Sequence, residues 1–380
     1  MRVCIVYDCL FPYTIGGAER WYRSLAEALA REGHDVTYLT MRRWEASSAP
    51  AVAGVRVVAV TGPHDLYTAS GRRAIGPPVA FGAGVFAHLL RHGGSYDVVH
   101  TASFPYFSAL AAGALRRPSG YELVVDWHEV WTGAYWHEYL GRMGGAVGAT
   151  VQLRCLRLRQ HALCFSAGVE RRLHAAGVRD VTRLAGLREL PPAQEPAPAG
   201  PAIVYAGRHI PEKQVPALVP AFLAARERIP GLRCEIYGDG PDRPAVLQAI
   251  AEQGLAGEVS APGFVEEGVL DEAIARALCF VLPSRREGYG LVVVEAAARG
   301  TPSVVVAGED NAALELVEEG VNGAVAASVA PEDLADAIER VQRGGPELRA
   351  STARWYRENA DRFSLERSLE IVARLYASLR

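Results

Sequence analysis

Lysine is almost absent from this sequence of 380 residues. Of the 40 basic residues, Lys213 is the one lysine, and all the others are arginine. A general preference for arginine explains the trend, but an ammonium group kept at one position marks that position as a candidate functional site.

Long hydrophobic runs and paired cysteines are also missing. The longest charge-free apolar stretches, residues 74–90 and 101–115, are interrupted by proline and are too short to span a bilayer. The opening residues do not resemble a signal peptide, so we expect a cytoplasmic protein. The six cysteines form no Cys-x-x-Cys pair and are expected to be reduced and mostly buried.

Several ligand motifs are lacking as well. Gly16 and Gly17 are not part of the Gly-x-Gly-x-x-Gly motif that binds dinucleotides. The sequence therefore argues against an NAD-dependent enzyme. There is no Asp-x-Asp metal motif, and neither Asp126-x-His128 nor His137-Glu138 has metalloprotease spacing. We therefore predict no metal and no cofactor, with a metal site as the minority alternative.

The composition is that of a globular protein with 49% hydrophobic and 22% charged residues. Its length suits two domains of about 150 residues each or slightly more. Residues 1–190 hold 21 Arg and 15 acidic residues, whereas residues 191–380 hold 19 basic and 28 acidic residues. A mildly basic first half can attract an anionic acceptor or an anionic lipid surface. A chance distribution of surface charges without any function is an equal alternative. No nucleic-acid partner is expected.

Buried apolar runs alternate with helical patterns along the whole chain. This alternation predicts an α/β fold with two Rossmann-like, doubly wound parallel-sheet domains facing each other across a cleft. The domains are expected at residues 1–190 and 202–360, with a stiff, solvated, proline-rich linker at 191–201 and a C-terminal helix at 361–380 that crosses back to the first domain. The strands are predicted at residues 2–7, 35–40, 55–60, 97–99, 122–126, 162–165, 202–206, 233–237, 277–282 and 303–306.

A glycine-containing loop ahead of a helix is the best-defined motif. Gly288 and Gly290 precede a helix that begins at Leu291, so the amides of Leu291 and Val292 are open to a phosphate. Glu287 in the loop and Glu295 in the helix can accept hydrogen bonds from vicinal hydroxyls. The motif therefore suits a ligand with both a diphosphate and sugar rings, while Glu295 as a simple N-terminal helix charge is the structural alternative.

Two cations lie in the loop after the first strand of the second domain. Arg208 can grip a diphosphate with its planar guanidinium, and Lys213 can follow a departing charge as a compact ammonium. Solvated loop charges are the alternative.

The first domain offers fewer candidates. Gly16 and Gly17 join its first strand to a helix and let the backbone approach a ligand. His128 lies at the end of a strand, where it could face an acceptor, although a lone histidine is often structural. Basic and apolar residues alternate at 153–159, which suggests a peripheral contact with anionic lipid; an internal helix with exposed arginines is the favoured alternative.

These motifs, in this order along nearly the whole chain, resemble the retaining glycosyltransferases of family 4, which have the GT-B fold. The resemblance rests on Gly-Gly-Ala-Glu at 16–19, Gly-Arg at 207–208, Glu-Lys at 212–213, Tyr-Gly-Asp-Gly at 237–240, Pro-Gly-Phe at 262–264 and the Glu-x7-Glu spacing of Glu287 and Glu295. Two segments depart from the family pattern, residues 185–189 in place of an Asn-Gly turn and residues 308–315 in place of a Gly-Gly loop.

The resemblance implies roles for particular residues. Arg208 and Lys213 would hold the donor diphosphate, Glu287 the donor sugar and Glu295 the nucleotide ribose, and His128 would lie near the reacting sugar. The implied catalytic residues are His128, Arg208, Lys213 and Glu287, and the implied donor-binding residues are Gly16, Gly17, Gly207, Arg208, Lys213, Gly238, Phe264, Val265, Glu287, Gly288, Tyr289, Gly290, Leu291, Val292 and Glu295.

The implied activity is metal-independent transfer of a hexose-type sugar from a UDP- or GDP-sugar, with retention of configuration, to a small-molecule, glycan or lipid-linked acceptor. A nucleotide-sugar epimerase or a phosphorylase on the same frame is the alternative enzyme. A phosphorylase is disfavoured because it needs a lysine for pyridoxal phosphate and Lys213 lies in another motif. A sugar-nucleotide-binding regulator without activity is the alternative outside enzymes.

Overall fold

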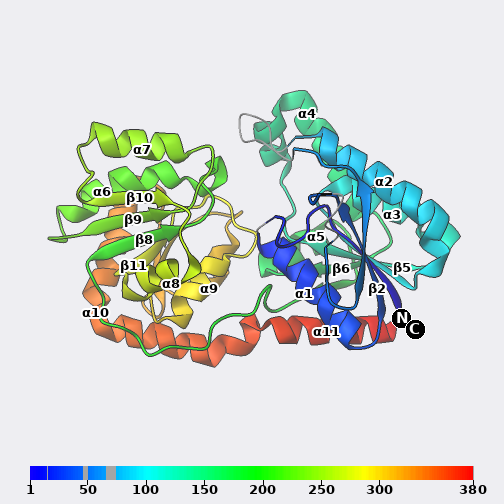
Figure 1. The fold of residues 1–380 in the computed structure, drawn as a ribbon. Coiled ribbons are helices and arrows are strands. Elements are labelled where there is room, and N and C mark those ends of the chain that lie inside the picture. Colours follow the sequence, from blue (N-terminus) through cyan, green and yellow to red (C-terminus); the bar gives the residue numbers. More distant parts are fainter. Residues whose placement is uncertain (15, 46–49, 66–73, 380) are drawn as a thin grey trace. The chain divides into compact units, whose positions relative to one another are not determined.

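The computed structural model describes residues 1–14, 16–45, 50–65 and 74–379, and it forms two compact units (Figure 1). The first unit consists of Met1–Glu189 and Ser364–Arg380, and the second of Leu190–Phe363. Each unit contains one parallel sheet with helices between its strands. The predicted fold class, α/β with two doubly wound parallel-sheet domains, is confirmed.

The first unit is built on a seven-stranded sheet in the order β3-β2-β1-β4-β5-β6-β7. The central strand β1 pairs in parallel with β2 and β4, so that Val3 lies beside both Val36 and Val98. These strands are apolar and buried, as expected for a sheet covered on both faces. The strands are β1 (Arg2–Val6), β2 (Asp35–Met41), β3 (Val55–Thr61), β4 (Val98–Ala102), β5 (Glu122–Trp127), β6 (His161–Cys164) and β7 (Val181–Arg183).

The direction of each crossover decides which face of this sheet a helix covers. The right-handed connection from β1 to β2 moves across the sheet toward β3 and places α1 on one face. The connections from β3 to β4, β4 to β5 and β5 to β6 are also right-handed but move toward β7, so they place α2, α3 and α4 on the opposite face. On that face α2 packs against α3, and α3 packs against α4. The helices are α1 (Gly17–Arg31), α2 (Gly76–His92), α3 (Tyr106–Ser119), α4 (Gly133–Leu156) and α5 (Ala167–Ala175), with a 3-10 turn η1 (Gly93–Ser95).

Helix α11 (Leu365–Ser378) joins the first unit from the far end of the chain and is held there by a buried polar chain. The Tyr376 hydroxyl lies 2.7 Å from Nδ1 of His100, whose Nε2 lies 2.7 Å from Oδ1 of Asp126. The Trp21 indole donates to Oδ2 of the same carboxylate at 2.8 Å. Burial by itself would raise the pKa of Asp126, but the charge and hydrogen bond of His100 and the bond from Trp21 hold it below its ordinary value.

The start of α11 also contacts the end of the first stretch of this unit. The Ser368 hydroxyl accepts a hydrogen bond from the Ala185 amide at 2.9 Å and donates to the Gly186 carbonyl at 2.8 Å. The Gly186 amide donates to the Ser364 carbonyl at 3.2 Å. The segment 185–189, which departs from the family pattern, is thus where the chain docks on the helix that returns.

The second unit is built on a six-stranded parallel sheet in the order β10-β9-β8-β11-β12-β13. Its strands are β8 (Ala202–Ala206), β9 (Arg233–Tyr237), β10 (Val259–Gly263), β11 (Cys279–Leu282), β12 (Ser303–Val306) and β13 (Gly323–Ala326). Its helices are α6 (Leu218–Arg226), α7 (Arg243–Glu252), α8 (Glu267–Arg276), α9 (Leu291–Ala298) and α10 (Pro331–Asn359), with 3-10 turns η2 (Pro211–Lys213), η3 (Val215–Ala217), η4 (Ala312–Leu316) and η5 (Ala360–Phe363).

The proline-rich segment at 191–200 has no helix or strand, as its composition predicts, but it is attached to the second unit rather than simply solvated. The buried guanidinium of Arg349 donates to the carbonyl of Ala197 at 2.9 Å and to the carbonyls of Ala277 and Ala275 at the end of α8. The Gly200 amide donates to the main-chain carbonyl of Arg276 at 2.7 Å. One planar cation with a fixed fork of donors therefore ties the segment down.

Two expectations from composition meet the structure directly. All six cysteines are free and buried, as predicted. Within the described ranges, no helix is both long and apolar enough to cross a bilayer. The cytoplasmic location stays a prediction.

Replacing Tyr376 by Phe should lower the free energy of unfolding by about 1–2 kcal/mol, because a buried ring nitrogen of His100 loses its partner. Urea denaturation followed by fluorescence measures the change, and Tyr13→Phe at an exposed position of the same unit is the control. Equal stability of wild type and Tyr376→Phe would contradict the described role of this hydroxyl.

Candidate active site

The loop after β8 carries both predicted cations at the carboxyl edge of the second sheet. The amides of Gly207 and His209 continue the ladder by donating to carbonyls at and just beyond the end of β9, at 3.2 and 2.9 Å. The chain then closes the 3-10 turn η2, which ends at Gln214 in the left-handed conformation, with φ 49°. Arg208 is exposed at the start of this loop, and Lys213 is half-buried at its end.

Glycines let the neighbouring loop after β9 approach this one closely. A Cβ atom on Gly238, whose φ is 109°, would lie 1.9 Å from the carbonyl oxygen of Gly207. A Cβ on Gly240 would lie 2.4 Å from the carbonyl oxygen of His209. The structure thus gives Gly238 a packing function, and its contact with a donor stays a prediction.

The loop after β11 brings Glu287 onto Lys213, although 74 positions separate them. Nζ of Lys213 lies 2.5 Å from Oε1 of Glu287, and these side chains are only 18% and 10% exposed. The Ser284 hydroxyl donates to the same oxygen at 2.9 Å, and the ammonium also lies 3.5 Å from the Arg286 carbonyl. The Glu287 carboxylate is therefore fixed by two partners through one oxygen.

The loop 308–315, which departs from the family pattern, supports Glu287 from the next strand. The buried Asn311 side chain donates to the carbonyls of Ser284 at 3.1 Å and Val306 at 2.8 Å, and it accepts from the Ala313 amide at 3.1 Å. The backbones of Glu287 and Asn311 form a parallel bridge. The loop that carries Glu287 is thus fastened, at Ser284 and at Glu287 itself, to the loop that follows β12.

Helix α9 begins where the glycine-containing loop ends. Gly290 is its N-cap with φ 94°, and no side chain caps the helix. A Cβ on Gly290 would lie 2.8 Å from that of Ala313, so the position needs glycine on two grounds. The first N–H groups of a helix have no acceptor within the helix. In the described part of the chain the amides of Leu291 and Val292 accordingly have no hydrogen-bond acceptor. The predicted open amides are in place.

The other predicted residues of this unit lie along the same edge of the sheet. Glu295 is half-buried one turn inside α9, and Gly288 is half-buried in the loop. Tyr289 is buried, and this burial raises the pKa of its hydroxyl. Phe264 and Val265 follow β10, two strands away from β8, and the Phe264 ring is strongly exposed.

The first unit places its own candidates at the carboxyl edge of its sheet. Gly16 caps α1 after β1, with extended backbone, and Gly17 opens the helix; Ile15, which precedes them in the motif, lies outside the described residues. His128 follows β5 and stacks on Phe165, with ring centroids 5.2 Å apart and an interplanar angle of 2°. Burial lowers the pKa of His128, against the raising effect of Asp126. Its Nε2 is buried and has no hydrogen-bond partner among the described residues.

The sequence did not point to three residues of the candidate site in the second unit. Ser284 and Asn311 hold Glu287, as described above, and His209 follows Arg208 directly. His209 is fully buried, which lowers the pKa of its ring, and it packs edge-on against Tyr205 with ring centroids 5.8 Å apart. The one sequence feature that could have indicated any of them is the position of Ser284, three residues before Glu287 in the same loop.

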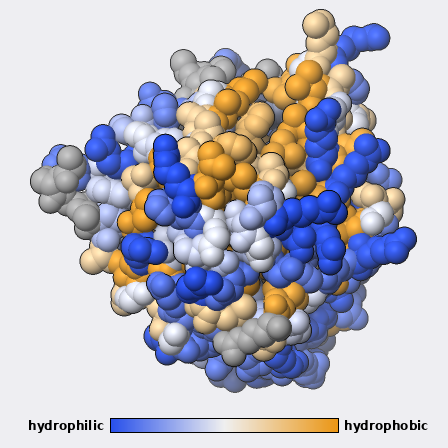
Figure 2. Space-filling view, turned by 90° about the vertical axis from the view of Figure 1, so that its right-hand side faces the viewer, coloured by the Kyte–Doolittle hydropathy of each residue, from blue (hydrophilic) through white to orange (hydrophobic). Residues whose placement is uncertain are grey.

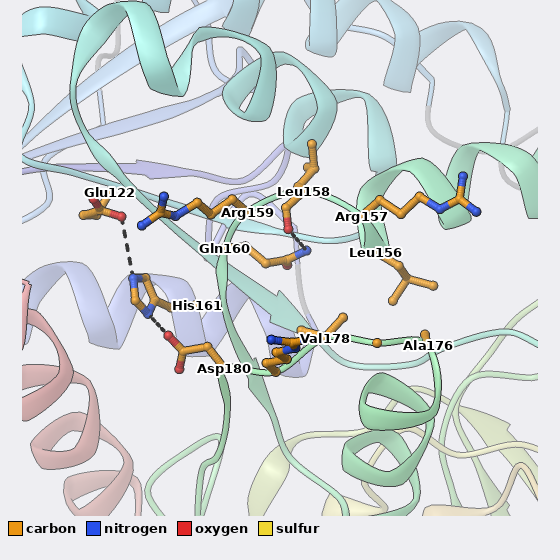
Figure 3. A pocket seen from close by; sticks show the side chains of 12 residues that line it. Glu122, Leu156, Arg157, Leu158, Arg159, Gln160, His161, Ala176, Val178 and Asp180 are labelled. Atoms are coloured by element: carbon orange, nitrogen blue, oxygen red, sulfur yellow. Dashed lines mark hydrogen bonds and ion pairs between the residues drawn. The ribbon is translucent and has the colours of Figure 1, made fainter.

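A cavity of about 480 Å³ lies elsewhere, at the amino edge of the first sheet (Figure 3). It is lined by Glu122 at the start of β5 and by residues 156–161 and 176–180. His161 lies between Glu122 and Asp180, and one ring nitrogen contacts each carboxylate (Figure 3). None of the predicted site residues lines this cavity. Within the residues described, no group of three or more His, Cys, Asp or Glu side chains is arranged to hold a metal ion.

Comparison with known families covers both units. Residues 15–184 match the family model described as Glycosyltransferase Family 4, and residues 200–343 match the one described as Glycosyl transferases group 1. The chain belongs to the family 4 glycosyltransferases of the GT-B fold, as the motifs suggested, and it is therefore a transferase of sugars.

Individual relatives agree with this assignment. The chain is 29% identical over 325 residues to a glycogen synthase of Mycobacterium tuberculosis, covering 80% of this chain and 77% of the relative. It resembles sucrose-phosphate synthase from Thermosynechococcus elongatus with a TM-score of 0.78 and 19% identity, over 100% and 98% of the two chains. It also resembles Anabaena Alr3699/HepE in complex with UDP-glucose, with a TM-score of 0.72 and 17% identity over the whole of both chains. At these identities the two solved structures support the fold alone.

The ion pair of Lys213 and Glu287 can be tested without any ligand. A double-mutant cycle with Lys213→Met and Glu287→Gln should give a coupling energy of about 1–2 kcal/mol, between the values for exposed ion pairs and for buried charge-assisted hydrogen bonds. Urea denaturation of the four proteins measures it. A coupling energy of zero would show that the two side chains do not interact in the free protein.

Proposed function

We propose that this chain transfers a sugar from a nucleoside-diphosphate sugar to a hydroxyl group, with the donor bound by the second unit and the acceptor by the first. One observation carries the proposal: Arg208, Lys213 and the open amides of α9 lie on neighbouring loops at one edge of the second sheet, beside the carboxylate of Glu287. Positive charge and main-chain donors suit a diphosphate, and the carboxylate suits a sugar hydroxyl.

The cations and amides supply stabilisation of the leaving group. As the bond between the sugar and the diphosphate breaks, negative charge grows on the departing phosphate oxygen. Preorganised donors of this kind are worth about 3–4 kcal/mol each in other enzymes. Because Arg208, Lys213 and the amides of Leu291 and Val292 provide such donors, the proposed reaction needs no divalent metal.

The carboxylates supply recognition of the donor. Both recorded contacts of the Glu287 side chain use Oε1, so we assign Oε2 to a hydroxyl of the donor sugar. Glu295 is assigned to the ribose because it lies one turn inside α9, beyond the amides that would hold the phosphates. Phe264 is assigned to the neighbourhood of the base, as an exposed aromatic ring that can cover it.

The proposed stereochemistry is retention. The acceptor hydroxyl attacks the anomeric carbon on the face from which the diphosphate leaves, so that the new carbon–oxygen bond forms as the old one breaks. The hydroxyl proton passes to the departing phosphate oxygen, and no enzymic nucleophile is needed. His128 is assigned to the reacting sugar or the acceptor, because its lowered pKa keeps the ring neutral at pH 7 and its Nε2 has no described partner.

The nature of the donor can be found by thermal stabilisation, since a ligand that binds only the native state raises the melting temperature. UDP-glucose is the first candidate because the similar Anabaena protein was solved with it, and GDP- and dTDP-sugars are the comparison. Incubation of the protein with the stabilising donor alone separates the alternatives, since a changed sugar without acceptor would indicate an epimerase. The anomeric configuration of the product, measured by NMR, tests retention.

Lys213→Met should lower kcat by about 100-fold or more at unchanged fold, because the leaving diphosphate loses a fixed cation. Lys213→Arg restores a charge with different geometry, and Arg226→Ala, which removes a cation from a surface ion pair with Glu258, is the matched control. Full activity of Lys213→Met would refute the assignment.

The single lysine permits a second test of that role. An amine-specific acylating reagent can modify only Lys213 and the chain's amino terminus, so mass spectrometry assigns each adduct without ambiguity. Bound donor nucleotide should protect Lys213 and leave the amino terminus reactive. Equal labelling of Lys213 with and without a saturating nucleotide would contradict contact with the diphosphate.

Glu295→Gln should weaken donor binding by about 1.5–3 kcal/mol, the usual value of a hydrogen bond to a charged group. Isothermal titration calorimetry measures the affinity, and the exposed Glu267, on α8 of the same unit, provides the control Glu267→Gln. An affinity unchanged by Glu295→Gln would rule out the ribose contact.

A further inference from the structure

Helix α2 presents an apolar outer surface. Ile75, just before it, and Val79, Phe86 and Leu90 within it are between 41% and 65% exposed. Their spacing of four, seven and four residues places them on one side of the helix, with Ala83 exposed in the gap. A helix at the surface of a globular protein ordinarily carries polar residues on that side. This stripe therefore has the character of a contact surface.

The apolar character continues on α4, which covers the same face of the sheet. Met143, Val147 and Leu153 are exposed on α4. Helix α3 lies between the two, since it packs against both α2 and α4. Figure 2 shows a hydrophobic area bordered by hydrophilic side chains. We call the exposed apolar residues of α2 and α4, with the arginines of α2–α4, the α2–α4 surface.

The charges of this surface have one sign almost throughout. Helices α2 and α3 contain no Asp or Glu, and α4 contains one, Glu138. The same helices contain five arginines, of which Arg116 pairs with Glu122. The other four form no ion pair with any described residue, and they are Arg91, Arg117, Arg142 and Arg154. The basic character of the first half of the chain is thus concentrated beside exposed apolar side chains.

We propose that the α2–α4 surface docks on an anionic lipid membrane, lying in the interface without crossing it. Apolar side chains flanked by arginines match the boundary between acyl chains and phosphate headgroups. The charge argues against a second copy of this chain, because a two-fold contact would bring the unpaired arginines of both copies together without acidic partners. The proposal takes up lipid contact, the less favoured of the two interpretations of residues 153–159, and extends it to a surface of three helices. It does not depend on the donor assignment.

Vesicle flotation tests the proposal on the intact chain. Wild type should float with vesicles of phosphatidylcholine mixed with phosphatidylglycerol, and less with phosphatidylcholine alone, and added salt should weaken the binding. The triple variant Val79→Ser, Phe86→Ser, Leu90→Ser should lose about tenfold or more in partitioning, as the loss of several buried apolar groups implies. The triple variant Arg117→Gln, Arg142→Gln, Arg154→Gln should lose the preference for the anionic lipid.

A matched control lies in the second unit. Leu247 on α7 and Val269 on α8 are 41% and 51% exposed, so Leu247→Ser with Val269→Ser removes exposed apolar side chains from another surface and should leave flotation unchanged. Circular dichroism and an unchanged melting temperature verify that each variant is folded. Absence of wild-type flotation on the anionic vesicles, or an equal loss in the control, would overturn the proposal. So would light scattering that shows a dimer abolished by the α2 variant, since the surface would then join two copies.

Discussion

Parallel strands deliver their carboxyl ends to one edge of a sheet, and the arrangement of the candidate site depends on this constraint. In the second unit five neighbouring strands, in the order β10-β9-β8-β11-β12, end in loops that carry Phe264, Gly238, Arg208, Glu287 and Asn311 respectively. Residues far apart in the chain therefore line one edge without any special device. The first unit repeats the principle with Gly16 after β1 and His128 after β5.

Close packing of these loops then sets the chemistry. Gly238 and Gly240 let the loop after β9 touch the backbone after β8, and Gly290 lets the start of α9 touch the loop after β12. With the loops this close, Lys213 meets Glu287, and neither side chain needs a ligand to hold its position. A site whose charges are already oriented has little reorganisation left to perform when the reaction begins.

Much of this could be read from the amino-acid sequence, because the central strands are uninterrupted apolar runs. Strands β8, β9 and β12 have the predicted bounds, and the start of α9 at Leu291 is marked by the glycines before it. Strands β7, β10 and β13 were not predicted. All three are edge strands of their sheets. Strand β7 has three residues, β10 contains Pro262, and β13 consists of Gly, Ala, Val and Ala, which have weak strand preference apart from the valine.

The candidate residues of the second unit could be named from the sequence, but their contacts with one another could not. The order of Arg208, Lys213, Glu287 and Glu295 pointed to them, whereas the ion pair depends on the 3-10 turn η2 and on the left-handed conformation of Gln214. The docking of residues 191–200 on Arg349 was equally hidden, since the arginine lies some 150 positions away and nothing in its neighbourhood marks it.

The return of α11 has a consequence for the order in which the chain acquires its structure during translation. The first unit lacks residues 364–380 until the ribosome has also made the second unit. Until then His100, which contacts Asp126, has no contact with the Tyr376 hydroxyl. Domains generally fold as units, in the order of synthesis. Here the second unit has all its residues before the first does, and the nascent first unit must remain tolerant of an uncovered polar cluster until then.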